Sequence, residues 1–504
     1  MAFTLASALK WWARDCPDRI ALSVDDRAVS YAQLYAWSAR IGAQLGASGA
    51  KPGDRIVIVG PNSMEYALLE FGVMRMGGIS APLAFRSTAR ELREAMQQLD
   101  PVLVFTDEER RPVVAEALGA AAAAKLRSLA EIAALDTGPL PQLDHEPEPD
   151  QALFIISTSG STGRPKGVVY SHRTLMIYAA ELAIVEPRCG SGGSFLSLGP
   201  FSSASGTLQL MQFVAIGNTV FVESKFEPER ALRLLVEQRI STFMAVPIFF
   251  ERIMALPGFA AADLSNLHYA QTAGARIAPA LLAAWRGKGI ILRQAYGSTE
   301  AGGAWAARDD TALTEPQKCG HGGMFEDYAI VDEQGRPAKP GVPGQILIRS
   351  PCLTPGYWHN PQATAEAIRD GWLYTGDLGM LDEHGNLTFI DRIKDIIISG
   401  GLNISAIELE RIIGEVPGVE EVAVIAVADA EFGETPLAVV YGASGQVAAA
   451  QIIRHCRQHL TGYKVPGYVV VSPEPLPRVP AGKISKPLLR EQYRDAPARL
   501  AKMR

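Results

Sequence analysis

The chain has 504 residues, of which 48% are hydrophobic and 20% are charged, and its formal net charge is −6. This length is too great for one ordinary hydrophobic core, and it predicts about two to four domains. The mildly acidic balance gives no electrostatic reason to expect a nucleic-acid partner or an anionic membrane partner.

The five cysteines are far apart and show no metal-ligand spacing, which is typical of a reduced, cytoplasmic protein. The N-terminal stretch "MAFTLASALKWWARDCPDRIAL" predicts an amphipathic helix instead of a secretion signal. No apolar run approaches the ~20 residues that a bilayer-spanning helix needs, so we expect no membrane insertion.

Short β-branched runs alternate with helical patterns through the first half of the chain. The expected strands there are at 54–60, 79–83 and 101–106, and the expected helices are at 64–76 and 88–99. This alternation predicts parallel sheets covered by helices.

The next stretches continue the α/β rhythm after an interruption. An Ala-rich stretch at 115–134 predicts a helix, and a Pro-rich acidic stretch at 136–150 predicts a surface connector. Further strands are expected at 195–199, 219–223, 241–246, 267–273 and 290–296.

After about residue 320 the pattern changes to short strands with Pro/Gly turns, which predicts a β-rich subdomain. The last ~110 residues combine a strand-like run at 419–429 with a helix-like run at 447–460. The predicted fold class is therefore α/β: a large N-terminal domain of α/β layers with a β-rich subdomain, followed by a small, mobile α+β C-terminal domain.

The stretch "STSGSTGRPKG" (157–167) follows a buried-strand pattern and consists mainly of Ser, Thr and Gly, with Lys166 as its only ammonium. Glycines allow backbone N–H groups to converge on an anion, and hydroxyls and an ammonium add donors and charge. The stretch matches neither the Walker loop nor the dinucleotide-binding fingerprint. On its own it is also compatible with an ordinary polar surface loop.

Four further stretches follow in fixed order: "YGSTE" (296–300), "YTGD" (374–377), "DRIKDIIISGGLNI" (391–404) and "PRVPAGKISK" (477–486). Together with the loop they resemble the adenylate-forming superfamily, which includes acyl-CoA synthetases, adenylation domains and firefly-type luciferases. The resemblance covers essentially the whole chain. It implies an N-terminal adenylation domain at 1–393, which binds the acid and ATP, and a C-terminal lid domain at 394–504 with its hinge at Lys394.

The resemblance also implies the chemistry of an acid–thiol ligase. A carboxylate attacks the α-phosphate of ATP and releases pyrophosphate, and a thiol then displaces AMP from the acyl-adenylate. Such a reaction needs charge neutralisation and alignment more than a strong base. The expected cofactors are ATP, Mg²⁺ and coenzyme A, and the expected setting is fatty acid or aromatic acid metabolism.

Nucleotide-binding roles follow from the resemblance, motif by motif. The clamp on the β- and γ-phosphates is assigned to Thr158, Ser159, Gly160, Ser161, Thr162, Gly163 and Lys166. Adenine is assigned to Gly274, Ala275 and Arg276 on one side and to Tyr296 on the other, followed by Gly297 and Ser298. Thr299 is assigned a hydrogen bond to phosphate and Glu300 the Mg²⁺ ion, although the same Ser-Thr-Glu run also matches a helix N-terminal cap.

The C-terminal motifs supply the remaining roles. Asp377 matches the ribose-binding acid, and Arg392 matches an arginine that reaches the same nucleotide. Lys483 matches the catalytic lysine that bridges the substrate carboxylate and the α-phosphate. Gly400 and Gly401 lack side chains and are expected to let a pantetheine arm pass along bare backbone. As isolated residues, Asp377 and Lys483 are equally typical of solvated turn charges.

The stretch "GPFSSASG" (199–206) departs from the family pattern, because Ser203 stands where acid–CoA ligases usually carry a His. The smaller residue indicates either a wider pocket or a weakened thioester step, and we favour the wider pocket. Phe249, Gly302 and Gly303 are the other candidate pocket residues, although Phe249 taken singly is more typical of a core residue. The predicted substrate is a medium-chain, aromatic or otherwise bulky carboxylic acid.

Two other functions stay open at this point. One is an acyl-AMP ligase that loads a carrier protein, and the other is a non-catalytic sensor that binds an adenylate. The complete set of pyrophosphate-releasing residues argues against the sensor. The sequence leaves both a monomer and a homodimer open.

Overall fold

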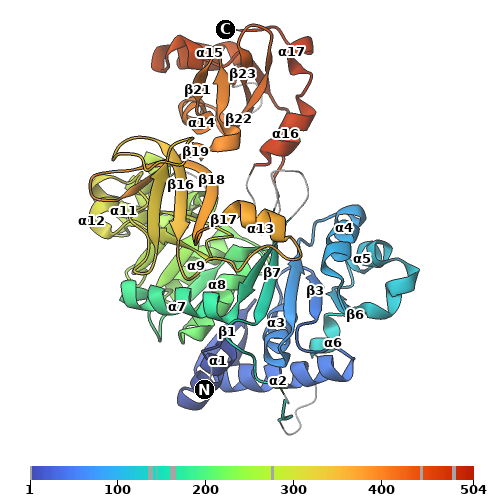
Figure 1. The fold of residues 1–504 in the computed structure, drawn as a ribbon. Coiled ribbons are helices and arrows are strands. Elements are labelled where there is room, and N and C mark those ends of the chain that lie inside the picture. The colour runs from blue at the N-terminus through green and yellow to red at the C-terminus, as the bar shows by residue number, and fades with distance from the viewer. Residues whose placement is uncertain are drawn as a thin grey trace. The chain divides into compact units, whose positions relative to one another are not determined.

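The computed structural model describes residues 3–133, 140–143, 145–158, 166–273, 277–442, 447–478 and 484–503. The chain divides into two compact units, residues 1–328 with 347–374 and residues 329–346 with 375–504 (Figure 1). None of the helices in the described ranges combines the length and the apolar character that a membrane crossing requires.

Two sheets organise the first unit. The eight-stranded sheet has the order β14 (Gly303–Ala306), β13 (Leu292–Ser298), β12 (Tyr269–Ala273), β11 (Thr242–Ala245), β9 (Ser194–Ser197), β10 (Thr219–Val222), β1 (Ile20–Val24), β2 (Arg27–Ser30). The six-stranded sheet has the order β6 (Leu126–Ser128), β5 (Leu103–Thr106), β3 (Arg55–Val59), β4 (Ile79–Leu83), β7 (Ala152–Thr158), β8 (Lys166–Ser171). Within the described parts of these sheets, only β2, β14 and β8 pair antiparallel, each with the strand beside it, so the predicted parallel sheets are confirmed.

Helices cover both faces of each sheet. The helices between the two sheets are α1 (Leu5–Asp15), α2 (Tyr31–Ala47), α3 (Met64–Met76), α7 (His172–Val185) and α8 (Ala204–Ala215). The outer face of the eight-stranded sheet carries α9 (Pro228–Glu237), α10 (Pro247–Met254) and α11 (Pro279–Gly287), and the outer face of the six-stranded sheet carries α4 (Ala89–Leu99) and α5 (Arg111–Leu118). The remaining helices of this unit are α6 (Ala130–Ala133), α12 (Asp309–Thr314) and α13 (Pro361–Ala367).

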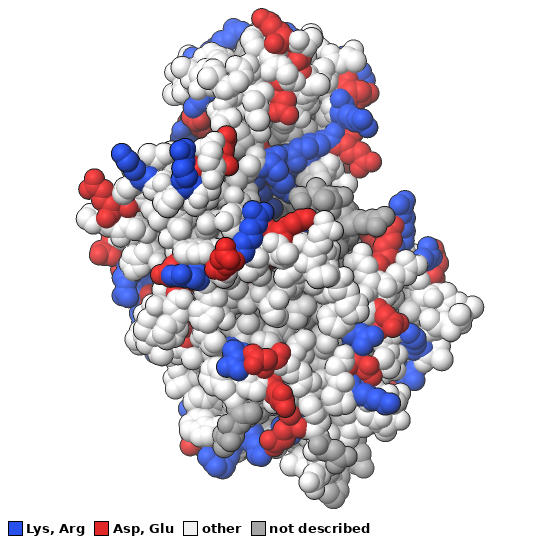
Figure 2. All heavy atoms as spheres, in the orientation of Figure 1, with Lys and Arg blue, Asp and Glu red and all other residues white. Residues whose placement is uncertain are grey.

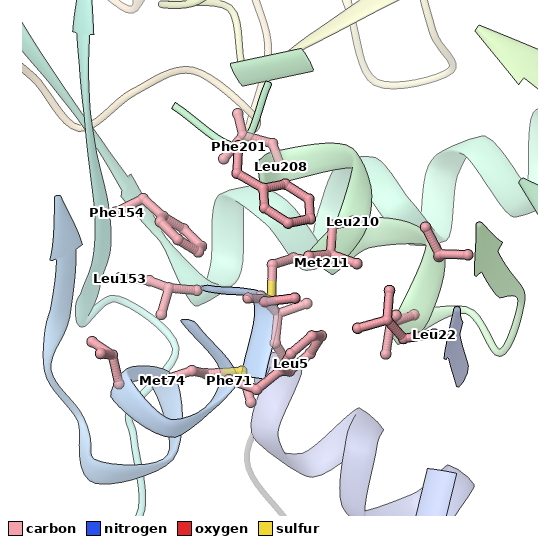
Figure 3. Close-up of a cluster of buried hydrophobic side chains, with 14 of the residues drawn as sticks. Leu5, Leu22, Phe71, Met74, Leu153, Phe154, Phe201, Leu208, Leu210 and Met211 are labelled. Carbon is pink, nitrogen blue, oxygen red and sulfur yellow. The ribbon is translucent and has the colours of Figure 1, made fainter. Parts of the chain in front are cut away.

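The sequence of each helix matches its layer. Helix α3, "MEYALLEFGVMRM", is apolar on nearly all sides and lies in the central layer, where almost every residue is buried. Helix α4 buries only Leu92, Met96 and Leu99, as expected for a helix that covers an outer face. Figure 3 shows the central core, in which Phe71 and Met74 of α3 lie near apolar side chains of α8 and β7.

The predicted helix at 115–134 is wrong. Helix α5 ends at Leu118, and Gly119 follows with a φ of +72°, which a right-handed helix does not allow. A short 3₁₀ turn, the edge strand β6 and the short helix α6 then occupy the stretch. The Ala-rich composition favours a helix, but the open edge of β5 takes β6 as a pairing partner, so tertiary pairing overrides local propensity. The described part of the predicted connector at 136–150 contains neither helix nor strand.

The β-rich region predicted after residue 320 is confirmed. Its strands are β15 (Asp327–Val331), β16 (Gly344–Arg349), β17 (Ile368–Arg369), β18 (Trp372–Leu381) and β19 (Leu387–Arg392). Strand β19 pairs antiparallel with β18, with Asp377 opposite Arg392.

The C-terminal part of the second unit is an α+β fold, as predicted. Its sheet has the order β21 (Leu402–Ile404), β20 (Ile397–Ser399), β23 (Gly433–Gly442), β22 (Val419–Asp429), and β24 (Tyr468–Val471) pairs with β23. One face carries α14 (Ala406–Gly414) and α15 (Ala449–His459), and the other carries α16 (Lys486–Gln492) and α17 (Ala496–Arg499).

Acidic and basic side chains are interspersed over the face of the molecule that Figure 2 shows. This distribution accords with the nearly balanced charge of the sequence.

Candidate functional site

Several of the predicted site residues lie outside the described residues. They are Ser159, Gly160, Ser161, Thr162 and Gly163 of the phosphate loop, Gly274, Ala275 and Arg276 of the adenine wall, and Lys483. The two ends of the phosphate loop are described: Thr158 closes β7, and Lys166 opens β8 directly opposite it. The predicted loop is therefore the connection of an antiparallel strand pair.

The motif "YGSTE" lies on a hairpin. Strand β13 ends with Tyr296, Gly297 and Ser298, and the chain turns back into β14, so that Ser298 pairs with Gly303. The alternative of a helix N-terminal cap is therefore wrong, because Gly302, with a φ of +79°, closes a strand turn here. Gly297 has its own reason to be glycine, since a Cβ there would lie 2.1 Å from the carbonyl oxygen of Gly303.

Backbone hydrogen bonds fix the turn that carries Thr299 and Glu300. The buried hydroxyl of Tyr170 donates to the carbonyl oxygen of Thr299, and the Thr354 N–H donates to the carbonyl oxygen of Glu300 at 2.9 Å. The residues Thr299 and Glu300 are half-buried, and these hydrogen bonds use only their carbonyl oxygens and not their side chains. The turn thus holds a hydroxyl and a carboxylate in fixed positions.

Glu300 and Lys166 both contact the side chain of Tyr357. The Tyr357 hydroxyl donates to Glu300 Oε1 at 2.9 Å, and Lys166 Nζ lies 4.8 Å from the centroid of the Tyr357 ring. Tyr357 is itself held beside β8 through a bridge to Val168. Burial and the nearby charge of Glu300 raise the pKa of Tyr357, which keeps it a hydrogen-bond donor.

This arrangement fits a phosphate ligand with its cation. In the described ranges no group of three or more His, Cys, Asp or Glu side chains could hold a metal ion by itself. Mg²⁺ usually binds one or two carboxylates together with substrate phosphates, so a single fixed carboxylate is a suitable donor set. Glu300 Oε1 is oriented by Tyr357, and the rest of the carboxylate offers further lone pairs.

Tyr296 is positioned by a second aromatic ring. Tyr296 is 6% exposed, and its ring forms a T-shaped pair with the ring of Tyr328, with a centroid distance of 6.2 Å and an interplanar angle of 71°. A tyrosine whose orientation is fixed in this way fits the stacking role that the sequence predicts.

Ser203 is the residue immediately before α8. Its hydroxyl donates to the Pro200 carbonyl oxygen at 2.9 Å and lies 3.0 Å from the Ser205 hydroxyl. The turn is tight, because a Cβ on Gly206 would lie 2.2 Å from the Pro200 carbonyl oxygen. Ser203 is thus a small side chain engaged in its own turn.

The other predicted pocket residues differ from one another. Phe249 is half-buried, and its ring forms a T-shaped pair with the ring of Phe226 at a centroid distance of 4.5 Å. Phe250, in contrast, is fully buried in the core. Gly302 and Gly303 do not open space on their Cβ sides. A Cβ on Gly302 would lie 2.1 Å from the carbonyl oxygen of Cys352. A Cβ on Gly303 would lie 2.0 Å from the ring of Tyr178.

In the second unit, Asp377 and Arg392 form a pair across β18 and β19. Arg392 Nε lies 3.4 Å from Asp377 Oδ1, and Asp377 is 5% exposed while the Arg392 side chain is about half exposed. The Asp377 N–H donates to the Thr375 hydroxyl at 3.1 Å. The two residues predicted to bind one nucleotide are therefore neighbours.

Lys394 follows Arg392 in a 3₁₀ turn, Ile393–Asp395. Burial and the charge of Arg392 lower the pKa of Lys394. Gly400 and Gly401 form the turn between β20 and β21, with φ values of +59° and +79°. The space beside Gly401 is open, since no atom lies within 4 Å of a Cβ placed there.

A family model of AMP-binding enzymes matches residues 9–358 of this chain, and the model of the AMP-binding enzyme C-terminal domain matches residues 408–483. The chain belongs to the AMP-binding enzyme family. This AMP-binding enzyme is 34% identical to a feruloyl-CoA synthase of an Amycolatopsis species over 492 residues, which cover 95% of this chain and 97% of that protein. It is also 34% identical to a long-chain-fatty-acid–CoA ligase of Mycobacterium tuberculosis, over 93% of this chain and 94% of the ligase.

A solved structure extends the likeness to the whole fold. The crystal structure of ATP-bound MatB from Rhodopseudomonas palustris matches this AMP-binding enzyme with a TM-score of 0.87 at 29% identity, over 98% of this chain and 100% of MatB. The predicted fold class and family are confirmed.

Sequence reasoning missed the two tyrosines that support the AMP-binding motif. Tyr170 lies in a buried strand, and Tyr357 lies in "GYWHN", which is outside the five motifs that carry the resemblance. A tyrosine carries no sequence signal for the oxygen to which its hydroxyl donates. Only the fold shows that both hydroxyls meet the "YGSTE" turn.

Proposed function

We propose that this protein is an ATP-dependent ligase that joins a medium-chain, aromatic or otherwise bulky carboxylic acid to coenzyme A. The observation that carries this proposal is the Lys166–Tyr357–Glu300 arrangement beside the "YGSTE" turn. It offers a cation for a polyphosphate and a fixed carboxylate for the associated metal, in a chain of the AMP-binding enzyme family.

The reaction has two balanced steps. A carboxylate oxygen of the acid bonds to the α-phosphorus of ATP while the bond to the bridging oxygen breaks, which gives acyl-AMP and pyrophosphate. The thiol sulfur of coenzyme A then bonds to the acyl carbon, its proton is lost, and AMP leaves with the mixed-anhydride oxygen. The products are acyl-CoA and AMP.

In the first step the chain neutralises and orients anions. Lys166 binds the β- and γ-phosphates together with Thr158 and the loop residues 159–163, and Thr299 donates to a phosphate oxygen. Glu300 holds Mg²⁺, with its carboxylate oriented by Tyr357. The bound ion supplies positive charge to the phosphate oxygens.

The remaining binding residues position the nucleotide and the acid. Tyr296 stacks on adenine opposite residues 274–276, and Gly297 and Ser298 continue that wall. Asp377 accepts hydrogen bonds from the ribose hydroxyls and Arg392 contacts the same nucleotide, which their 3.4 Å pairing supports. Lys483 bridges the substrate carboxylate and the α-phosphate.

For the second step we propose that the C-terminal domain, residues 394–504, turns about Lys394. Gly400 and Gly401 then border the pantetheine path, and the open space beside Gly401 supports this role. The acid pocket is bordered by Ser203, Phe249 and the turn at Gly302 and Gly303. A feruloyl-CoA synthase among the relatives supports an aromatic acid.

The proposed setting is the cytoplasm, supported by five cysteines that are all free. Monomer and homodimer are both compatible with this function.

The test is pyrophosphate release across a panel of aromatic and medium-chain acids, with product masses determined after adding coenzyme A or a holo-carrier protein. We expect acyl-CoA from a bulky acid. Formation of an acylated carrier protein without acyl-CoA would favour the carrier-loading alternative. No pyrophosphate release with any acid would favour the sensor.

A variant pair tests the site itself. Lys166→Ala should lower the rate of pyrophosphate release by about 100-fold or more, because it removes a charge that acts on the departing phosphates. Lys225→Ala is the matched control, since the Lys225 side chain is 81% exposed and its ion pair is with the nearby surface residue Glu227. Equal rates in both variants would contradict the role of Lys166.

A further inference from the structure

Glu70 is a fully buried carboxyl group in the central layer of the first unit. It lies on α3, it is 0% exposed, and its partner is Thr207 on α8. Figure 3 shows the apolar cluster that these two helices share, with Phe71 next to Glu70 in sequence and Leu208 next to Thr207. An ionised carboxylate is strongly disfavoured in such surroundings unless it is well compensated.

The hydrogen bonds of Thr207 indicate where the proton lies. Thr207 Oγ1 is 2.6 Å from Glu70 Oε1 and 2.9 Å from the carbonyl oxygen of Phe201. A hydroxyl has one proton, and both an ionised carboxylate and a carbonyl oxygen are acceptors only. Both contacts are hydrogen bonds only if Glu70 carries a proton and donates it to Thr207, which then donates to Phe201.

Among the residues that the structure describes, no charged side chain offsets the burial of Glu70. Its Oε2 atom has no hydrogen-bond partner among the described residues. Burial raises the pKa of Glu70 to about 8, and the hydrogen bond with Thr207 offsets this only in part. The titratable group that interacts with it is Tyr66, one turn earlier on α3, whose own pKa is raised by burial and by Glu70.

The Phe201 carbonyl belongs to the loop 199–206, which carries Ser203. Asn62, just before α3, holds the same loop from a second side. Its Nδ2 donates to the Gly199 carbonyl oxygen at 3.0 Å, and its Oδ1 accepts from the Phe201 N–H at 2.7 Å. Asn62 thus binds the N–H of Phe201 directly, and Glu70 reaches the carbonyl oxygen of Phe201 only through Thr207 of α8.

We propose that protonated Glu70 is a positioning residue, which through Thr207 holds the 199–206 loop in the shape that binds the acid. Ionisation of Glu70 leaves two acceptors facing one hydroxyl proton, so the Phe201 carbonyl loses its donor and the loop loosens. The inference rests on the proposed function, because that function makes Ser203 and its loop a border of the acid pocket.

The test measures the KM of the acid by ATP–pyrophosphate exchange between about pH 6 and about pH 9, where substrate carboxylates stay ionised and no thiol is present. In the wild type, the acid KM should rise about tenfold between about pH 7 and about pH 9, with a small change in kcat. Glu70→Gln is the matched variant, because its amide donates to Thr207 and cannot ionise. The acid KM of Glu70→Gln should stay the same across this pH range. Any change caused by ionisation of ATP affects both proteins equally and therefore drops out of the comparison.

A second pair of variants, at Thr207, distinguishes loss of the hydroxyl from a general disturbance of the fold. Thr207→Val should raise the acid KM several-fold at every pH, and Thr207→Ser should restore it, since serine keeps the donor. An infrared difference spectrum between wild type and Glu70→Gln at about pH 7 should show a protonated carboxyl band in the wild type.

The possible failures are distinguishable. An acid KM that is flat in the wild type, or that follows the same pH profile in Glu70→Gln, would overturn the positioning role. Absence of the protonated carboxyl band would overturn the proton assignment whether or not the enzyme turns over. Silence with every acid, with the band present, would reject the proposed function and with it the positioning role, while leaving the proton on Glu70.

Discussion

The glycine pairs Gly302–Gly303 and Gly400–Gly401 have similar positions in two hairpins, but they meet different surroundings. In the first pair, the space of each Cβ is filled by protein, by the Cys352 carbonyl and by the Tyr178 ring. In the second pair, no atom lies within 4 Å of a Cβ placed on Gly401, and a Cβ placed on Gly400 would lie 3.1 Å from an aromatic carbon of Phe432. Gly302, Gly400 and Gly401 all have positive φ, so both hairpins use glycine for a left-handed turn, but only the first hairpin also uses it for close packing.

The strongest test of this comparison is Gly303→Ala. Its Cβ would lie 2.0 Å from Cε2 of the buried Tyr178 ring, so the β13–β14 hairpin must shift. We expect a loss of about 1–3 kcal/mol in the free energy of unfolding, measured by urea denaturation, together with slower pyrophosphate release. Gly258→Ala is the control, because the nearest atom to its Cβ is 3.9 Å away. Equal stability of the two variants would show that the hairpin tolerates the added methyl group.

Gly401→Ala tests the open hairpin. Its φ of +79° is unfavourable for alanine, so we expect a loss of about 1–2 kcal/mol in the free energy of unfolding. The added methyl group also borders the proposed pantetheine path, so acyl-CoA formation should slow more than acyl-AMP formation. Product masses in single-turnover samples measure both steps. Gly371→Ala has the same φ of +79° and no atom within 4 Å of its Cβ, and an equal slowing of its thioester step would reject the path.

The smallest expected effect has the opposite sign. Gly46 lies inside helix α2, and no atom lies within 4 Å of its Cβ position. Gly46→Ala should therefore raise the free energy of unfolding by about 0.5–1 kcal/mol through lower backbone entropy of the unfolded chain. Thermal unfolding measures this, and any destabilisation would mean that an open Cβ position is not sufficient for tolerance.

Most of the fold was predictable because local patterns and layers agree. The helical patterns at 64–76 and 88–99 predicted α3 and α4, and the apolar character of each run agrees with its burial in the structure. The stretch after residue 115 was not predictable in this way, because Gly119 and the pairing of β6 with β5 decide its structure. Sheet pairing depends on residues far apart in the chain, and composition carries no information about it.

The motifs of the candidate site were predictable from the sequence, but the contacts that hold those motifs in place were not. The "YGSTE" residues were named from a resemblance, while their place on a strand hairpin depends on β14 returning beside β13. The hydroxyls of Tyr170 and Tyr357, and the proton shared by Glu70 and Thr207, depend on contacts across the fold. Such contacts have no periodicity and no fixed spacing in the sequence.

The Tyr357 ring has a consequence for the empty enzyme. Lys166 and Glu300 carry opposite charges, and among the described residues no ion pair joins them; instead, Lys166 lies beside the Tyr357 ring and Glu300 accepts from its hydroxyl. Direct contact would neutralise both groups and make an incoming triphosphate compete with an internal partner. Because each group contacts Tyr357 and no ion pair joins the two, each charge is available for its own ligand before any nucleotide arrives.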